Sequence, residues 1–265
     1  MRASVSAAAA PVRRDALRPA LNRVPKVTAI FWIVKVLTTG MGETTSDFFV
    51  KRFPPEIVVP IAFVVLVVML VLQFRLRRYV AAVYWTTALA VSIFGTMAAD
   101  VLHVGLGVPY VASTIAFATV LAGIFLLWYR TERTLSVHAI TTRRREAFYW
   151  ATVLTTFALG TAAGDWTAVT LGLGYLASGV VFAAVIALPA LAHRFLGLNA
   201  VLAFWFAYVI TRPLGASFAD WLGVSTARGG LDLGTGPVSL AAFVLFAILV
   251  GVLAVRRGDI EAAAA

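Results

Sequence analysis

The chain of 265 residues has no cysteine, which excludes disulfide bonds, thiolate metal sites and cysteine nucleophiles. Charge is scarce as well, since 13% of the residues are charged whereas an average soluble domain has about 25%. In place of charge the chain has long apolar runs, with 61% hydrophobic residues and a mean hydropathy of +0.92. These values exclude a soluble globular domain and predict an integral membrane protein.

The apolar runs have the length of membrane spans. A helix needs about 20 predominantly apolar residues to cross the hydrocarbon core of a bilayer. Stretches of this length lie near residues 27–49, 56–74, 80–101, 108–129, 147–169, 173–192, 199–221 and 236–255. The sequence therefore predicts an all-α membrane protein with eight transmembrane helices.

The two ends of the chain lie outside these runs. Residues 1–26 are rich in Ala, Pro and Arg and contain no apolar run long enough for the core of a signal peptide. We interpret this segment as a mobile cytoplasmic tail, and residues 256–265 as a second cytoplasmic tail.

Acidic residues are few, 12 against 22 basic ones, so the formal net charge is +10. In a soluble chain this excess would suggest nucleic acid, but the location of the charges must be considered before their total. Seventeen basic residues lie in the tails and in alternate connections, three lie in the other connections, and Lys35 and Arg212 lie within spans. This positive-inside bias predicts cytoplasmic termini and explains the basic residues without a nucleic-acid partner.

Four segments align without a gap, and each has a glycine ten residues and an aspartate fifteen residues after a tryptophan. The aligned residues are Trp32, Gly42 and Asp47; Trp85, Gly95 and Asp100; Trp150, Gly160 and Asp165; and Trp205, Gly215 and Asp220. In two copies, GLGVPYVAS and GLGYLAS place Tyr110 and Tyr175 ten residues after the aspartate. Each unit contains two spans, so all four share one orientation and are related by axes along the membrane normal.

This arrangement resembles a family of bacterial "membrane-anchored" proteins built from four tandem repeats of a two-helix domain of unknown function with a characteristic tryptophan. The resemblance covers roughly residues 24–255, and the strings GET (42–44) and TRPLGA (211–216) add to it. It implies the architecture and no established activity. We place the repeats at residues 27–76, 80–129, 146–193 and 199–255 and expect a multi-pass protein of the bacterial inner (plasma) membrane.

The spacing within a repeat assigns roles to its constant residues. Because a helix rises 1.5 Å per residue, the tryptophan and the aspartate lie about 22 Å apart along the axis. We expect the tryptophans to anchor the cytoplasmic interface or to pack in the core, and the aspartates to lie near the periplasmic end. A small residue follows each glycine by four positions, which predicts close helix packing. These small residues are Ser46, Ala99, Gly164 and Ala219.

The aspartates are candidates for ion binding, because an ionisable residue within a span normally faces a partner or a water-filled cavity. Glu43, Thr96 and Thr161 lie four residues before an aspartate, on the same helical face, and add oxygen atoms; the fourth repeat has Ala216 there. The predicted substrate- or ion-binding residues are Glu43, Asp47, Asp100, Asp165, Asp220, Thr96, Thr161 and Arg212. The alternative is that the aspartates cap helix ends or bond to the next connection.

Two cations and one histidine depart from the repeat pattern. Arg212 lies near mid-span, and we predict a buried pair with Glu43 because both residues break the pattern. Lys35 lies on the inner half of its helix and is expected to snorkel to the cytoplasmic surface. His103 follows Asp100 by three residues, which suits a metal or proton site, although a lone interfacial histidine is often a polar end-cap. The predicted metal ligands are Glu43, Asp47, Asp100, His103, Asp165 and Asp220.

These residues favour a transporter of a small cation. Carboxylate and hydroxyl oxygens suit Mg, Ca or Mn better than softer metals, and aspartates can also relay protons. We expect a divalent metal such as manganese or magnesium as substrate and no cofactor, and we leave proton coupling open as an alternative. The asymmetry introduced by Arg212 favours a two-domain transporter, made of two parallel pairs of repeats, over a cation channel with a pseudo-fourfold ring of aspartates.

Other classes of function fit less well. The chain lacks the GxGD string of membrane aspartyl proteases, so we do not expect an enzyme. A membrane scaffold or sensor subunit is the remaining alternative, in which the buried charges are structural pairs. The expected partners are the lipid bilayer and a small cation or proton, with no nucleic acid, and the sequence leaves open whether a homo-oligomer forms.

Overall fold

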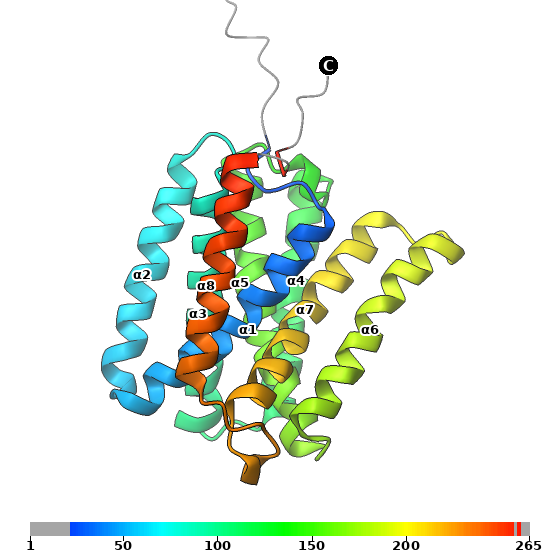
Figure 1. Ribbon diagram of the computed structural model, residues 1–265. Helices are drawn as coiled ribbons and strands as arrows, with labels where there is room; N and C mark the ends of the chain where they lie inside the picture. Colours follow the sequence, from blue (N-terminus) through cyan, green and yellow to red (C-terminus); the bar gives the residue numbers. More distant parts are fainter. Residues whose placement is uncertain (1–21, 257–258, 261–265) are drawn as a thin grey trace, which may run out of the picture.

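The computed structural model describes residues 22–256 and 259–260, which form a bundle of eight long α-helices without a β-strand in this part of the chain (Figure 1). The helices are α1 (Ala29–Arg52), α2 (Pro55–Arg75), α3 (Ala81–Asp100), α4 (Tyr110–Glu132), α5 (Arg143–Asp165), α6 (Gly174–Leu196), α7 (Ala200–Gly223) and α8 (Thr235–Arg256). Each predicted span coincides with one helix, so the all-α fold class is confirmed.

Short polar side chains mark several helix starts. The side chains of Thr28 and Thr142 accept hydrogen bonds from backbone N–H groups in the first turns of α1 and α5, and Asn199 does the same for α7. These are N-caps, which satisfy donors that the first helical turn leaves free. Helix α2 instead begins at Pro55, whose fixed φ suits the first helical position.

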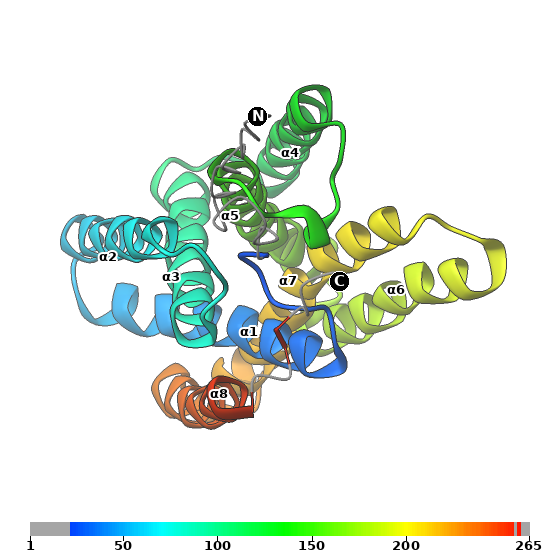
Figure 2. The same ribbon diagram turned by 90° about the horizontal axis from the view of Figure 1, so that it is seen from above.

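The helices form two layers around one axis (Figure 2). The first helices of the repeats, α1, α3, α5 and α7, each contact two neighbours and close an inner ring. The second helices lie outside it: α2 packs on α3, α4 on α5, α6 on α7, and α8 on α1. Each outer helix therefore covers the inner helix of the following repeat, whereas α1 and α2 have few contacts with each other. The expected division into two pairs of repeats is not seen, since the inner helices form a single ring.

Six of the helices are long and apolar enough to cross a membrane, namely α2, α3 with the turn that follows it, α4, α6, α7 and α8. The outer helices expose large apolar side chains, such as Ile61 and Val64 on α2 and Leu240 on α8. A continuous apolar outer surface of this kind is suited to lipid contact. Helices α1 and α5 are equally long but more polar, and many of their polar residues are buried.

The repeat glycines hold the inner ring together. A Cβ atom added to any of these glycines would overlap a residue of the neighbouring inner helix. In each case that residue lies seven positions after the repeat tryptophan of its own helix. The added Cβ atom would lie 1.8 Å from Ser92 at Gly42, 2.8 Å from Phe157 at Gly95, 2.3 Å from Arg212 at Gly160, and 1.9 Å from Thr39 at Gly215. The predicted close packing is confirmed, and the same contact recurs at all four interfaces of the ring.

The repeat tryptophans pack mainly inside the bundle. Trp85, Trp150 and Trp205 are buried in a cluster of aromatic rings, and Trp32 is half-buried at its edge. The cluster includes Tyr84 and Tyr149, whose hydroxyl groups are hydrogen-bonded to each other. Core packing, one of the two expected roles, therefore describes three of the tryptophans, because the inner helices turn this face toward the axis of the ring.

Residues near both ends of the described chain pack at the aromatic end of the bundle. Arg23 pairs with the buried carboxylate of Glu146 at 2.6 Å, and Gln73 donates to the same carboxylate. The Tyr79 hydroxyl donates to Asp259, and burial together with this hydrogen bond raises the pKa of Tyr79 above its usual value. Of the tail expected at residues 1–26, Arg23, Val24 and Pro25 are buried in the bundle and Lys26 is exposed, while residues 1–21 lie outside the described part of the chain.

Candidate functional site

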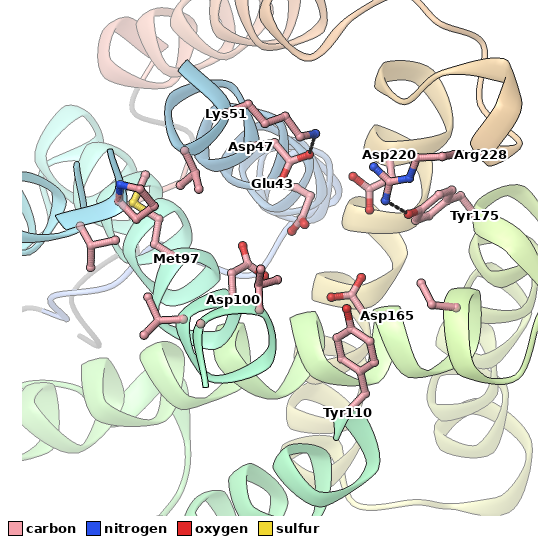
Figure 3. Close-up of a pocket in the computed structure, with 17 residues that line it drawn as sticks. Glu43, Asp47, Lys51, Met97, Asp100, Tyr110, Asp165, Tyr175, Asp220 and Arg228 are labelled. Carbon is pink, nitrogen blue, oxygen red and sulfur yellow. Dashed lines mark hydrogen bonds and ion pairs between the residues drawn. The ribbon is translucent and has the colours of Figure 1, made fainter. Parts of the chain in front are cut away.

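The repeat aspartates meet in one cavity of about 390 Å³ (Figure 3). The cavity lies at the end of the ring where α1, α3, α5 and α7 end. Each inner helix contributes one aspartate from its last turns, because the residue spacing from tryptophan to aspartate is the same in every repeat. The carboxylates that line the cavity are Glu43, Asp47, Asp100, Asp165 and Asp220. The expectation that the aspartates share a cavity is confirmed, and the alternative of separate helix caps does not describe them.

Two cations at the cavity make the carboxylates unequal. The Lys51 ammonium contacts Asp47 one helical turn away, at 2.5 Å. Arg228, from the connection between α7 and α8, donates to the Tyr175 hydroxyl, which lies beside Asp220 in the cavity wall (Figure 3). Asp100, Asp165 and Asp220 have no ion pair within the described residues. Of the four repeat aspartates, these three therefore present carboxylates that are free to bind a further cation.

Arg212 lies next to the cavity, outside its lining, and binds Glu43 of the lining. Its side chain is fully buried, and its Nη2 atom is bonded to Glu43, to the Thr96 hydroxyl at 2.6 Å and to the Thr161 hydroxyl at 2.7 Å. These three partners occupy one repeat position on the three other inner helices, and Ala216 occupies it on α7 itself. The predicted pair of Arg212 with Glu43 is confirmed, and the guanidinium lies on the axis that the four repeats surround.

The two threonines bind Arg212 and not the aspartates. Thr96 donates its hydroxyl proton to the Ser92 carbonyl and Thr161 donates to the Phe157 carbonyl, each one turn earlier on its own helix. Their oxygen atoms then accept from the guanidinium. Because these donors and acceptors are already used, the threonines hold the arginine in place and offer the cavity little further oxygen.

Beneath Arg212 the axis is filled by side chains. Phe157 is fully buried, with the guanidinium of Arg212 5.8 Å and the ammonium of Lys35 4.0 Å from its ring centroid. Lys35 also lies 4.2 Å from the ring of Tyr208, and its ammonium has no hydrogen-bond partner among the described residues. The expected snorkelling of Lys35 is wrong, because its helix turns this side chain toward the ring axis, where the nearest groups are aromatic rings. Below them, the aromatic cluster closes the ring.

His103 lies beside two of the aspartates. A ring nitrogen of His103 and one carboxylate oxygen each of Asp100 and Asp165 all lie within 4.8 Å of one another. Glu43, Asp47 and Asp220 line the same cavity but do not join this three-residue group in the described part of the chain. The structure thus brings half of the predicted metal ligands within reach of a single ion.

A short π-helix follows the aspartate in the two middle repeats, at Val101–Gly105 and at Trp166–Thr170. Such one-turn π segments are rare and often occur at functional sites, because the wider turn redirects the side chains that it carries. In this chain the first segment carries His103. The matching Gly-rich strings and the equal spacing to Tyr110 and Tyr175 were signals of a shared local structure in these repeats.

Sequence reasoning missed several residues of the cavity wall, among them Lys51, Met97, Tyr110, Tyr175 and Arg228. The two tyrosines were visible as a repeat feature, and the i,i+4 spacing of Asp47 and Lys51 was a local signal of pairing. Arg228 carried no such signal, because its place at the cavity depends on how the connection between α7 and α8 folds back.

Comparison with known proteins agrees with the repeat architecture. Residues 30–79, 83–134, 148–197 and 203–259 each match the family described as Repeat of Unknown Function (DUF347). Searches of curated proteins and of solved structures gave no significant match to the chain. The four matches together cover most of the sequence, and each contains one inner and one outer helix. The chain therefore belongs to the DUF347 repeat family.

Proposed function

We propose that the protein is an integral membrane transporter of a small cation, a divalent metal ion, that binds in the carboxylate-lined cavity. The observation that carries this proposal is the meeting of Asp47, Asp100, Asp165 and Asp220, from four separate repeats, in one cavity. Ionisable residues within membrane helices are costly and normally serve a substrate path or a proton relay.

The charge balance of the site supports a cation as substrate. Five carboxylates line the cavity, while the cations are Lys51 and Arg228 in its wall and Arg212, which lies outside the lining but is paired with Glu43. With all groups ionised, a formal charge of −2 remains. One divalent metal ion or two protons would neutralise it, which makes protons natural competitors and coupling ions for the same site.

We also propose that all eight helices cross the bacterial inner membrane, with both termini in the cytoplasm and the cavity facing the periplasm. Helices α1 and α5 are less apolar than the other six because they contain charged residues such as Lys35, Glu43 and Glu146, and these residues are buried. Each of the two packs against three other long helices of the bundle and runs beside them (Figure 2). The concentration of basic residues at the end with the termini supports this orientation.

A cation channel is the second candidate, favoured by the closed ring of inner helices around one axis. The side chains on the ring axis next to the cavity favour a transporter instead. A cation crossing the ring would meet the Arg212 guanidinium and then the Phe157 ring and the Lys35 ammonium on the same axis. Passage therefore requires Arg212 to leave its partners, which is a conformational step typical of alternating access.

The test is flux of Mn²⁺, Mg²⁺ and protons into proteoliposomes that contain the wild type or one of four variants. The variants are Asp47→Asn, Asp100→Asn, Asp165→Asn and Asp220→Asn. Asp232→Asn is the matched control, because Asp232 is an exposed residue of the connection between α7 and α8 and does not line the cavity.

We expect saturable flux of at least one of these cations in the wild type and in Asp232→Asn, and strongly reduced flux in the cavity variants. Unchanged flux in all four cavity variants would overturn the proposal and leave the carboxylates with a structural role, as in a scaffold or sensor. Stepwise single-channel currents in a planar bilayer would decide for the channel.

A further inference from the structure

We infer that Asp100 and Asp165 in the wall of the cavity, together with the Nδ1 atom of the adjacent His103, form a binding site for a first-row transition metal ion. The inference rests on the proposed cation transport and narrows its substrate class, since a nitrogen ligand favours Mn²⁺, Fe²⁺ or Zn²⁺ over Mg²⁺ and Ca²⁺. It stands on the geometry of the three side chains and on the hydrogen bonds of the imidazole.

The ligand atoms come from two adjacent inner helices. Asp100 ends α3 and His103 lies in the π-helix directly after it, while Asp165 ends α5. The ring nitrogen and the two carboxylate oxygens already lie within 4.8 Å of one another, so small side-chain rotations suffice to bring all three onto one ion. The Tyr110 ring packs on the imidazole with centroids 4.5 Å apart and fixes its position.

Hydrogen bonds with Ser113 determine which nitrogen of His103 is available. Ser113 Oγ lies 2.6 Å from His103 Nε2, and either atom can be the donor of that hydrogen bond. If Ser113 donated to Nε2, the proton of the neutral ring would be on Nδ1, where a buried N–H group would have no acceptor among the described residues. The favoured arrangement therefore has Nε2 donate to Ser113, while the Ser113 hydroxyl donates to the Tyr110 carbonyl at 3.0 Å or the Pro109 carbonyl at 3.3 Å. In the neutral imidazole Nδ1 is therefore the atom with the free lone pair.

This Nδ1 atom is buried and has no hydrogen-bond partner within the described residues. The His103 side chain is 8% exposed, so water does not readily replace the missing partner. If the ring were an imidazolium, its buried Nδ1–H group would have no acceptor in this part of the chain, since neither Asp100 nor Asp165 accepts a hydrogen bond from it. A buried lone pair on an imidazole that lies beside two carboxylates is an arrangement that a metal cation satisfies.

The donor set limits the metals that fit. Imidazole suits Zn, Cu, Fe and Ni, whereas carboxylates suit Mg, Ca and Mn, so a mixed set favours the ions that accept both. The three other repeats have Val50, Ala168 and Gly223 at the position of His103, so the nitrogen ligand is a property of one repeat. The Nε2–H group bonded to Ser113 is the usual outer support of a metal-binding histidine, because it fixes the tautomer and the ring orientation.

The test is direct metal binding by the purified, full-length protein in detergent, with Mn²⁺ binding followed by electron paramagnetic resonance and with Mg²⁺ added as competitor. His103→Gln should lower Mn²⁺ affinity more than about 100-fold, since loss of outer-shell support alone costs about 10- to 100-fold. Ser113→Ala should fall in that smaller range. His193→Gln is the control, because His193 is an exposed histidine at the opposite end of the bundle and should bind Mn²⁺ as the wild type does.

Two results would overturn the inference: equal Mn²⁺ affinity of His103→Gln and the wild type when both elute as folded protein, or displacement of Mn²⁺ by equimolar Mg²⁺. The outcome is separable from that of the transport proposal. If the aspartate variants lose flux but His103→Gln keeps the wild-type metal preference, the cavity transports cations and the nitrogen ligand is not part of the site. If Mn²⁺ binds as expected but no variant changes flux, the site is real and the transport proposal fails.

Discussion

The guanidinium of Arg212 reaches from the fourth repeat to the carboxylate of Glu43 in the first, and the two form a buried ion pair at the centre of the inner ring. Nη2 also bonds the two threonines at the equivalent position of the second and third repeats, while Nε and Nη1 have no partner among the described residues. One side chain thus ties together all four repeats, and it separates the acidic cavity from the aromatic half of the ring.

Glu43→Gln should destabilise the protein strongly, because it leaves the Arg212 charge buried without a counter-charge. Removing one partner of a buried ion pair costs about 3–5 kcal/mol, whereas replacing both partners by apolar residues is often neutral. We therefore expect Glu43→Gln to lower the unfolding temperature in detergent and the double variant Glu43→Leu with Arg212→Met to recover much of the loss. Glu56→Gln is the control, since Glu56 is exposed on α2. A double variant less stable than Glu43→Gln would contradict this account.

Gly160→Ala should weaken the ring at the interface of α5 with α7. The added Cβ atom would lie 2.3 Å from Cγ and 2.5 Å from Cβ of Arg212, so the arginine would have to shift away from its three partners. Overpacking of this kind costs about 1–3 kcal/mol. The matched control is Gly123→Ala on α4, where nothing lies within 4 Å of the new atom and helix propensity predicts a gain of up to about 1 kcal/mol. Equal unfolding temperatures for the two variants would show that the close contact has no energetic weight.

The helices could be predicted well from the sequence, because a membrane span needs about 20 predominantly apolar residues. Length and hydropathy located every helix, and the constant spacing of Trp, Gly and Asp fixed the fourfold repeat. The pairing of outer helices with the next repeat could not be predicted, since consecutive helices of one repeat are the natural first guess and nothing in the chain reports which neighbour the outer helix covers. The single ring of inner helices, found in place of two pairs of repeats, could not be predicted for the same reason.

The parts of the site that follow from the positions of residues in the repeat could be predicted from the sequence. The parts that depend on how side chains pack across the ring could not. The shared cavity and the pair of Arg212 with Glu43 followed from residues that stand at, or depart from, one repeat position. The inward orientation of Lys35 could not be predicted, because burying an ammonium group without a hydrogen-bond acceptor is energetically costly. The use of both threonine hydroxyls by Arg212 also depends on distances across the ring that no sequence pattern specifies.

Lys35→Met should leave the protein as stable as the wild type or make it more stable. The Lys35 ammonium is buried without a hydrogen-bond acceptor, and the rings of Phe157 and Tyr208 offset its desolvation only in part, since a desolvated cation–π contact is worth about 2 kcal/mol. Methionine has a similar length and fills the same space without charge. Lys26→Met, at an exposed position, serves as control for the loss of a positive charge. A lower unfolding temperature for Lys35→Met than for Lys26→Met would mean that the ammonium stabilises the ring.

Arg23→Met should loosen the end of the bundle where the chain termini lie. Arg23 is the ion-pair partner of Glu146, and the remaining neighbour Gln73 supplies a hydrogen bond but no charge. Because the Glu146 side chain is fully buried, loss of its partner should cost about 3–5 kcal/mol. Hydrogen exchange at the first turn of α5 reports the effect locally, and faster exchange there is expected. Arg143→Met, which removes an exposed arginine from the same turn, should change stability by no more than about 0.5 kcal/mol. If both variants exchange at the wild-type rate, the buried pair does not hold this end closed.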